Sequence, residues 1–164
     1  MKKIIIGIMG PGEGATSNDL SVAFELGAEI ASRNWVLLTG GRNVGVMHEA
    51  SKGAKSKNGL TIGILPSEDK VSVSDFVDIP IITGMGNARN NINVLSSEVL
   101  IICGNGPGTL SEIGLGMKAN KYIIGMNIPQ KSIEAIENFS GSKIILSSSV
   151  KNTIELIISI IKDY

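Results

Sequence analysis

The stretch that decides the fold is Val99–Leu100–Ile101–Ile102–Cys103, followed by Gly104–Asn105–Gly106–Pro107–Gly108–Thr109–Leu110–Ser111–Glu112. A short apolar run bounded by glycine is typical of a strand that is buried on both faces of a sheet. The segment Leu110–Asn120 after it has helical character. The order is therefore strand, glycine-rich loop and helix start. This order favours a phosphate site, because free backbone N–H groups and the positive end of the helix dipole converge there.

The glycine-rich loop itself supplies the first candidate ligand contacts. Glycine allows a ligand to approach the backbone closely, so we predict that Gly106, Pro107, Gly108 and Thr109 hold a phosphate. Thr109 is also the predicted helix cap, and Glu112 stands three residues on, at the spacing of a capping box. The alternative is that the Glu112 carboxylate lies beside the bound phosphate ester, facing a sugar carbon. The local pattern leaves both alternatives open.

Composition bounds the class of protein. The 164 residues suit one domain spanning 1–164, and 15 basic residues balance 15 acidic ones. A formal net charge of zero gives no indication of a nucleic-acid or polybasic membrane surface. No apolar run approaches membrane-spanning length. A single cysteine excludes an internal disulfide and fits a reducing compartment, so we expect a cytoplasmic protein without a nucleic-acid or membrane partner.

Strand-like and helix-like segments alternate along the whole chain. This alternation predicts an α/β fold in one domain, with a doubly wound, Rossmann-like, mainly parallel sheet and helices on both faces. Pro80 favours an edge position for its strand, and the polar stretch Ser67–Ser74 is the expected mobile loop. The expected strands are Lys3–Met9, Trp35–Thr39, Leu60–Leu65, Val77–Ile82, Val99–Cys103, Tyr122–Met126 and Lys143–Leu146. The expected helices are Asn18–Arg33, Val46–Lys57, Asn87–Ser97, Leu110–Asn120, Pro129–Asn138 and Val150–Lys162.

Four glycine-bearing loops follow expected strands, and the carboxyl ends of parallel strands share one edge of the sheet. We therefore predict a binding site at that edge. The loops are Gly10–Ser17, Gly40–Gly45, Gly84–Gly86 and Gly104–Gly108. The first two loops contribute the candidate ligand residues Gly10, Gly40, Gly41, Arg42 and Gly45. Arg42 is either a second phosphate contact or a solvated loop charge.

Several other kinds of chemistry lack the residues they need. His48 is the only histidine and Cys103 the only cysteine, so a metal site of imidazoles and thiolates is disfavoured. Cys103 ends an apolar strand and is interpreted as a small core residue. His48 has no matching serine elbow, which disfavours a Ser–His–Asp mechanism. The dinucleotide and nucleoside-triphosphate glycine motifs are absent from the sequence.

Three segments carry a resemblance to a known family: Gly40–Met47, Met85–Asn90 and Gly106–Glu112. In this order they resemble the LOG ("lonely guy") superfamily, once labelled as lysine decarboxylases. That superfamily includes cytokinin-activating phosphoribohydrolases and molybdenum-cofactor carrier proteins. The resemblance covers roughly the first four-fifths of the chain.

The resemblance implies roles for particular residues. The enzyme branch carries Pro-Gly-Gly-x-Gly-Thr-x-x-Glu, which aligns with Gly104 to Glu112, and Met-x-x-Arg-Lys, which falls on Arg89. It implies that Glu112 and Arg89 are catalytic and that Met85 belongs to the ligand site. Asn90 stands where that branch has lysine, so the chain looks closer to the carrier-like branch.

The implied function is binding of a phosphate- or nucleotide-type ligand, as in molybdenum-cofactor carriers. The alternatives are a nucleoside 5′-monophosphate phosphoribohydrolase and a non-catalytic nucleotide sensor, for which Ser67–Ser74 would be the lid. The implied ligand is the molybdenum cofactor or a nucleoside monophosphate. We also expect a homo-oligomer, a dimer or tetramer, because Ile92, Val94 and Leu95 point in several directions around one helix and resembling proteins assemble through it.

Overall fold

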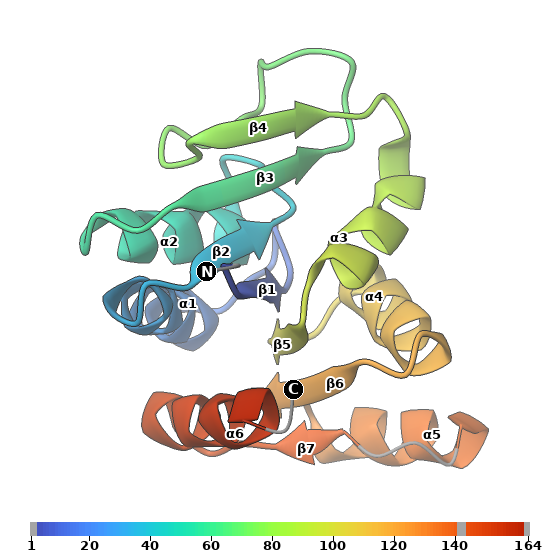
Figure 1. Ribbon diagram of the computed structural model, residues 1–164. Helices are drawn as coiled ribbons and strands as arrows, with labels where there is room; N and C mark the ends of the chain where they lie inside the picture. The colour runs from blue at the N-terminus through green and yellow to red at the C-terminus, as the bar shows by residue number, and fades with distance from the viewer. Residues whose placement is uncertain (1–2, 141–143, 163–164) are drawn as a thin grey trace.

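A computed structural model describes residues 3–140 and 144–162. They form one sheet of seven parallel strands in the order β4-β3-β2-β1-β5-β6-β7 (Figure 1). This arrangement confirms the predicted Rossmann-like fold. The strands are β1 (Ile5–Met9), β2 (Val36–Thr39), β3 (Thr61–Leu65), β4 (Ile79–Ile82), β5 (Val99–Cys103), β6 (Tyr122–Met126) and β7 (Ile145–Leu146). The helices are α1 (Ser17–Ser32), α2 (Gly45–Lys55), the 3₁₀ helix η1 (Gly86–Arg89), α3 (Asn90–Ser96), α4 (Pro107–Lys118), α5 (Gln130–Ser140) and α6 (Val150–Lys162).

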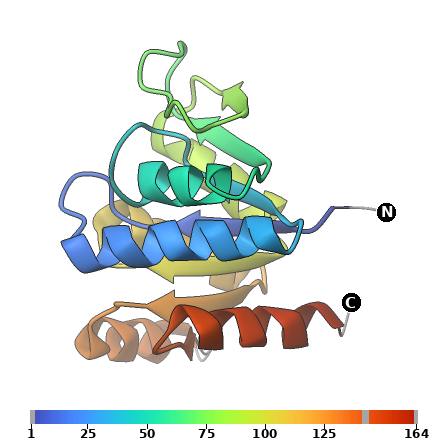
Figure 2. The ribbon, with the colours of Figure 1, turned by 90° about the vertical axis from the view of Figure 1, so that its left-hand side faces the viewer.

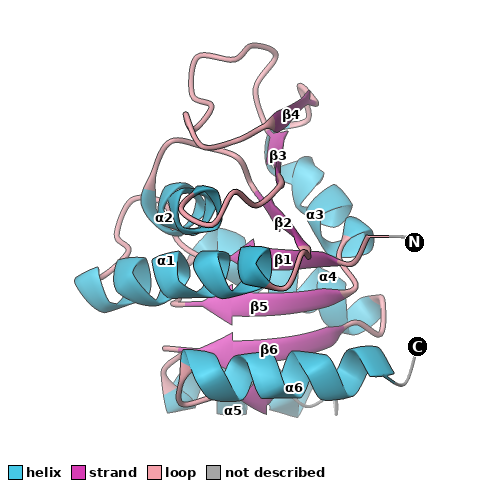
Figure 3. Cartoon of the chain, turned by 60° about the vertical axis from the view of Figure 1, so that its left-hand side comes forward, coloured by secondary structure: helices cyan, strands magenta, loops and turns pink. Residues whose placement is uncertain are grey.

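Strand β5 lies between two helical layers, and all five of its residues are fully buried. Its side chains alternate between the layers, as the pleat of a strand requires. Ile101 and Cys103 pack into the core formed with α1, α2 and α6, whereas Leu100 and Ile102 pack into the core formed with α3, α4 and α5. Figures 2 and 3 show the first layer, with α1, α2 and α6 on one face of the sheet.

Helix α4 begins three residues earlier than predicted. Its N-cap is Gly106, which has no capping side chain, and Pro107 occupies the first turn. Proline is favoured there because its missing N–H would have no helical partner and its φ suits the helix. Thr109 is thus inside the helix rather than at its cap, which excludes the capping-box alternative for Glu112.

A capping box is present elsewhere, at the start of α1. The Thr16 hydroxyl oxygen accepts from the Asp19 N–H at 3.1 Å, and the Asp19 carboxylate accepts from the Thr16 N–H at 3.0 Å. Asp19 also accepts a hydrogen bond from the Asn127 amide at 3.0 Å. It therefore joins the loop after β1 to the loop after β6, at the edge of the sheet where the site was predicted.

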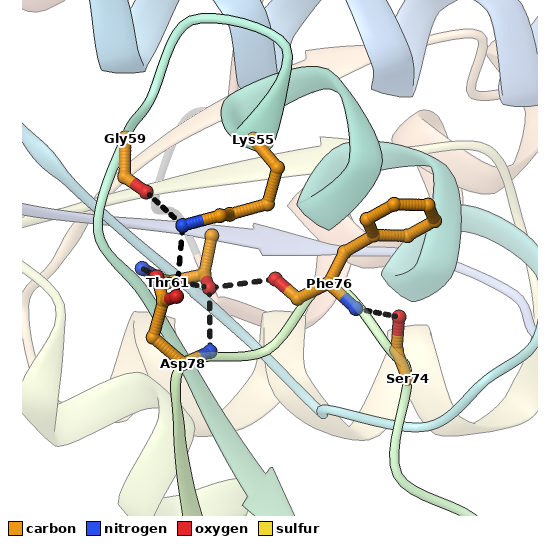
Figure 4. A network of polar contacts seen from close by, with 6 residues as sticks. All are labelled: Lys55, Gly59, Thr61, Ser74, Phe76 and Asp78. Carbon is orange, nitrogen blue, oxygen red and sulfur yellow. Dashed lines mark hydrogen bonds and ion pairs between the residues drawn. The ribbon is translucent and has the colours of Figure 1, made fainter.

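Strand β4 is an edge strand, as Pro80 indicated, but it starts at Ile79 rather than Val77. The polar network drawn in Figure 4 precedes it. Lys55 Nζ donates to Asp78 Oδ1 at 2.8 Å, and the Thr61 N–H donates to Asp78 Oδ2 at 3.0 Å. Partial burial acts to raise the pKa of Asp78, but these hydrogen bonds outweigh it and hold the pKa below its ordinary value. The network fixes where β4 enters the sheet.

Two further sequence predictions can be compared with the structure. Cys103 is a buried core residue as predicted, and burial raises the pKa of its thiol to about 12, which leaves it unreactive. Part of the polar segment 67–74 is tied to the loop after β2, because the Ser74 N–H donates to the Gly41 carbonyl at 2.9 Å. Lys143, the expected start of the last strand, lies outside the described residues. No helix in the described part is long and apolar enough to cross a membrane.

Candidate functional site

A cavity of about 290 Å³ lies beyond the carboxyl ends of the central strands. Strand β1 sits between β2 and β5, so the chain order reverses at β1. Such a switch point leaves a crevice because the connections on its two sides run to opposite faces of the sheet. Residues from the loops after β1, β2 and β5, together with η1 and the start of α3 and α4, line the cavity. We call this cavity the cradle.

Most of the predicted site residues line the cradle. They are Gly10, Gly40, Arg42, Arg89, Gly106, Pro107, Gly108, Thr109 and Glu112. Gly41, Gly45 and Met85 are not among its lining residues. Gly45 has a positive φ of 57°, and a Cβ there would lie 2.4 Å from the Pro11 carbonyl oxygen. Its glycine therefore serves the close packing of α2 on the loop after β1.

Arg89 is the most unusual group in the cradle. Only 9% of the residue is exposed, and its Nε and Nη1 atoms are buried without a hydrogen-bond partner. Gly40 makes room for it, because a Cβ at that position would lie 2.3 Å from Nη1. Burial lowers the pKa of Arg89, Glu112 acts in the opposite direction, and Arg42 adds to the lowering. A buried cation with unpaired donors is costly, and an anionic ligand would supply the missing partners.

The start of α4 adds neutral donors to the same cavity. The hydroxyl of Thr109 is buried and has no hydrogen-bond partner. The N–H groups of Gly108 and Thr109 lie in the first turn, where no helical carbonyl can accept from them. Pro107 has no N–H, so it can only shape the loop. A Cβ at Gly108 would meet no atom within 4 Å, so the space beside this residue is open.

Glu112 is the buried acidic residue of the cradle, and only 6% of it is exposed. Asn93 Nδ2 donates to its Oε1 at 2.8 Å. Burial raises the pKa of Glu112, while the Asn93 hydrogen bond and the Arg89 charge oppose the rise without cancelling it. The carboxyl therefore takes up a proton closer to neutral pH than an ordinary glutamate does.

Sequence reasoning missed the asparagines that support the site. Asn90 Nδ2 donates to the Ser111 hydroxyl at 2.7 Å, and that hydroxyl donates to the Gly108 carbonyl at 2.7 Å. Asn93 is fully buried and holds Glu112. The signal was the spacing: Asn93 follows Arg89 by four residues, which places both on one helical face. The first glycine-rich loop also contributes Glu13, an exposed carboxylate that lines the cradle.

The cradle thus gathers two arginines, a buried hydroxyl and helix-start amides around one buried carboxyl group, with the exposed Glu13 carboxylate at its side. Such a donor set can hold a phosphate or a similar anion. Within residues 3–140 and 144–162, no three His, Cys, Asp or Glu side chains are grouped so that they could hold a metal ion.

The chain belongs to the SLOG cluster4 family, whose model matches residues 3–154. Its structure is similar to that of the molybdenum cofactor binding protein from the phototrophic bacterium Rippkaea orientalis, with a TM-score of 0.96 and 60% identity over 98% of this chain and 99% of that one. It is also similar to the molybdenum cofactor carrier protein of Chlamydomonas reinhardtii, with a TM-score of 0.92 and 44% identity over 98% and 99% of the two chains. The predicted resemblance to carrier proteins is therefore confirmed.

A more distant relative is an enzyme. The cytokinin riboside 5′-monophosphate phosphoribohydrolase of Mycobacterium tuberculosis is 32% identical over 96 residues. The match covers 57% of this chain and 51% of the enzyme. A member of the enzyme branch is thus among the relatives of this chain, but the match covers only about half of the length of that enzyme.

The placement of Glu112 generates a prediction about pH. A bound dianion would add negative charge next to this carboxyl group, so protonation of Glu112 should favour binding. We expect sulfate, which stays dianionic, to bind more tightly as the pH falls from 8 to 5. Glu112→Gln should bind sulfate about tenfold more tightly at pH 8 and lose most of the pH dependence. Isothermal titration calorimetry measures both.

The matched control is Glu13→Gln. That carboxylate lines the cradle but is solvent-exposed, so water screens its charge and the affinity should change little. A Glu112→Gln protein with the parent's pH profile would show that Glu112 does not sense the bound anion.

Proposed function

We propose that this chain is a single-domain, cytoplasmic carrier that binds a phosphorylated small molecule in the cradle, with the molybdenum cofactor as its cargo. The observation that carries the proposal is the set of buried, unpartnered donors on Arg89 and Thr109. An anionic group on the ligand would satisfy all of them. The similarity to the Rippkaea orientalis protein over nearly the whole of both chains supports the choice of cargo.

The chemistry of the cradle suits a cargo that is held by its phosphate. The cofactor is a phosphorylated pterin, and the cradle offers guanidinium, hydroxyl and amide donors to an anion. The cysteine thiol is buried in the core with its pKa raised to about 12, so it is poorly suited to bind molybdenum. Recognition in this proposal therefore rests on the organic part of the ligand.

Arg89 provides the direct test. Arg89→Met should weaken inorganic phosphate binding at least tenfold, about 1.4 kcal/mol, because the charged donors are lost. The free energy of unfolding should change by no more than about 1 kcal/mol, since buried N–H atoms without partners contribute no hydrogen bonds to the folded protein. Calorimetry and urea unfolding measure the two quantities. A loss of several kcal/mol in stability with unchanged phosphate affinity would mean that Arg89 serves only the fold.

A second candidate function is the hydrolysis of a nucleoside 5′-monophosphate. Glu112 favours it, because a buried carboxyl near an arginine can stabilise the positive charge that develops on a ribosyl carbon. Water would add across the N-glycosidic bond, with its hydroxyl on the sugar carbon and its proton on the released base. The relative in Mycobacterium tuberculosis supports this reading over part of the chain.

Incubation with AMP separates the two functions. The carrier proposal expects AMP to remain intact over hours at micromolar protein. The hydrolase alternative expects free adenine and ribose 5-phosphate in equal amounts, and it expects Glu112→Gln to abolish their release. Chromatography of the reaction mixture measures both products. Equal release by the parent and by Glu112→Gln would point to a contaminating enzyme.

We also propose that the carrier is a homo-oligomer, a dimer or tetramer, assembled through α3. Leu95 on α3 is 55% exposed, and Tyr122 at the start of β6 is 42% exposed. The two segments are adjacent, because Lys121 Nζ donates to the Leu95 carbonyl at 3.1 Å. Exposed apolar side chains on neighbouring elements are a common feature of subunit contacts, and two-fold symmetry would bring α3 of each copy together.

Leu95→Glu tests the assembly. The parent should scatter light with a mass of two or four times 17.2 kDa, and the variant should scatter as a monomer, because a charge buried at a subunit contact is costly. Val71→Glu is the matched control, since Val71 is 90% exposed in the polar segment 67–74 and should leave the mass unchanged. A parent mass near 17.2 kDa would contradict the proposal.

A further inference from the structure

A second, apolar cavity adjoins the cradle. It is a groove of about 580 Å³ between the start of α4 and helix α5. Asn105, Gly106 and Pro107 line both the groove and the cradle, so the two spaces meet at this loop. The remaining residues that line the groove are Leu110, Ser132, Ala135 and Ile136.

The two cavities differ in charge. The cradle is lined by Glu13, Arg42, Arg89 and Glu112, whereas the groove has no charged side chain among its lining residues. Leu110, in the first turn of α4, is 53% exposed. Leu110 therefore presents exposed apolar surface next to the polar anion site, and the apolar residues of α5 that line the groove extend this surface. A molecule with one charged end and one uncharged end matches the pair of cavities.

We propose that the groove binds the uncharged ring system of the same ligand whose phosphate occupies the cradle. This inference rests on the proposed function and adds a subsite to it. The ligand would cross the loop at Gly106, where the absence of a side chain allows close approach to the backbone. Pro107, Leu110 and Ile136 would contact the face of the ring, and the Asn105 amide and Ser132 hydroxyl lie where they can reach polar atoms on its edge.

Another groove of comparable size provides a contrast. It lies between α1 and α6, has a volume of about 470 Å³, and is lined by charged residues that include Glu25, Glu29, Arg33, Lys151 and Glu155. It shares no lining residue with the cradle. Nothing links it to the anion site, but it offers a control position, Ala28, that lines a groove on the other face of the sheet.

The experiment fills each groove with a bulky side chain and measures binding of three probes. The variants are Ala135→Trp in the proposed subsite and Ala28→Trp as the control. Ala135 is solvent-exposed, so tryptophan can enter the groove without displacing the core. The probes are inorganic phosphate, ribose 5-phosphate and AMP, of which only AMP carries a planar ring. Calorimetry on the full chain gives each affinity.

We expect the parent and Ala28→Trp to bind AMP about tenfold more tightly than ribose 5-phosphate. In Ala135→Trp this advantage should vanish, while the affinity for inorganic phosphate stays within twofold of the parent. Leu110→Ala should reduce the advantage by about threefold, because it removes only part of the apolar contact.

Two results would overturn the subsite while leaving the proposed function intact. One is a parent that binds AMP no more tightly than ribose 5-phosphate. The other is an Ala135→Trp protein that keeps the full advantage for AMP. Absence of phosphate binding in the parent would instead overturn the proposed function, and the subsite with it.

Discussion

The burial of β5 on both faces is the constraint on which the rest of the structure depends. Its five residues contact no solvent, and alternate side chains fill the cores on the two sides of the sheet. Because every side chain of β5 packs into one of the cores, none is available for catalysis or ligand binding. A functional site must therefore lie beyond the end of the strand. The loop that follows at Gly104 has a positive φ of 85°, which turns the chain into α4 beside the loop after β1. The cradle follows from that turn.

The electrostatics of the cradle depend on groups that the fold leaves incompletely paired. Two buried guanidinium nitrogens of Arg89 have no hydrogen-bond partner, and Glu112 is held by Asn93 rather than by a direct ion pair with Arg89. Both pKa values are displaced toward the neutral form, mainly by burial. If Arg89 and Glu112 were bonded directly to each other, the donors of Arg89 would already be paired, and an anionic ligand would add little stability. Two buried groups of opposite charge that are not bonded to each other leave donors available for an anion.

The fold could be predicted largely from the sequence, because the alternation of apolar strands with helical segments needs no long-range information. The edge position of β4 followed from Pro80, and the gathering of the glycine-rich loops followed from parallel topology. The start of α4 was missed because Thr109 and Glu112 have capping-box spacing, while the rarer signal, Pro107 in the first turn, decided the boundary. The contact of Asn93 with Glu112 joins residues of two helices, so no local pattern contains it. Gly45 was expected at the ligand, but its positive φ serves packing.

Asn90 stands where the enzyme branch of the resembling superfamily has lysine, and its contacts indicate what the amide contributes in this chain. In this chain Asn90 is buried and hydrogen-bonded to Ser111, which in turn bonds the Gly108 carbonyl. This chain of contacts stiffens the start of α4, the element whose amides face the cradle. A lysine at the same place would bring a third cation toward the ligand. A positive charge at this position would stabilise negative charge that develops during a reaction. The hydrogen-bonded amide of Asn90 instead favours a binding surface held in one conformation. In the proposed carrier, retention of a ligand would draw on the second property, and the hydrogen-bonded start of α4, between the cradle and the groove, is where this chain would provide it.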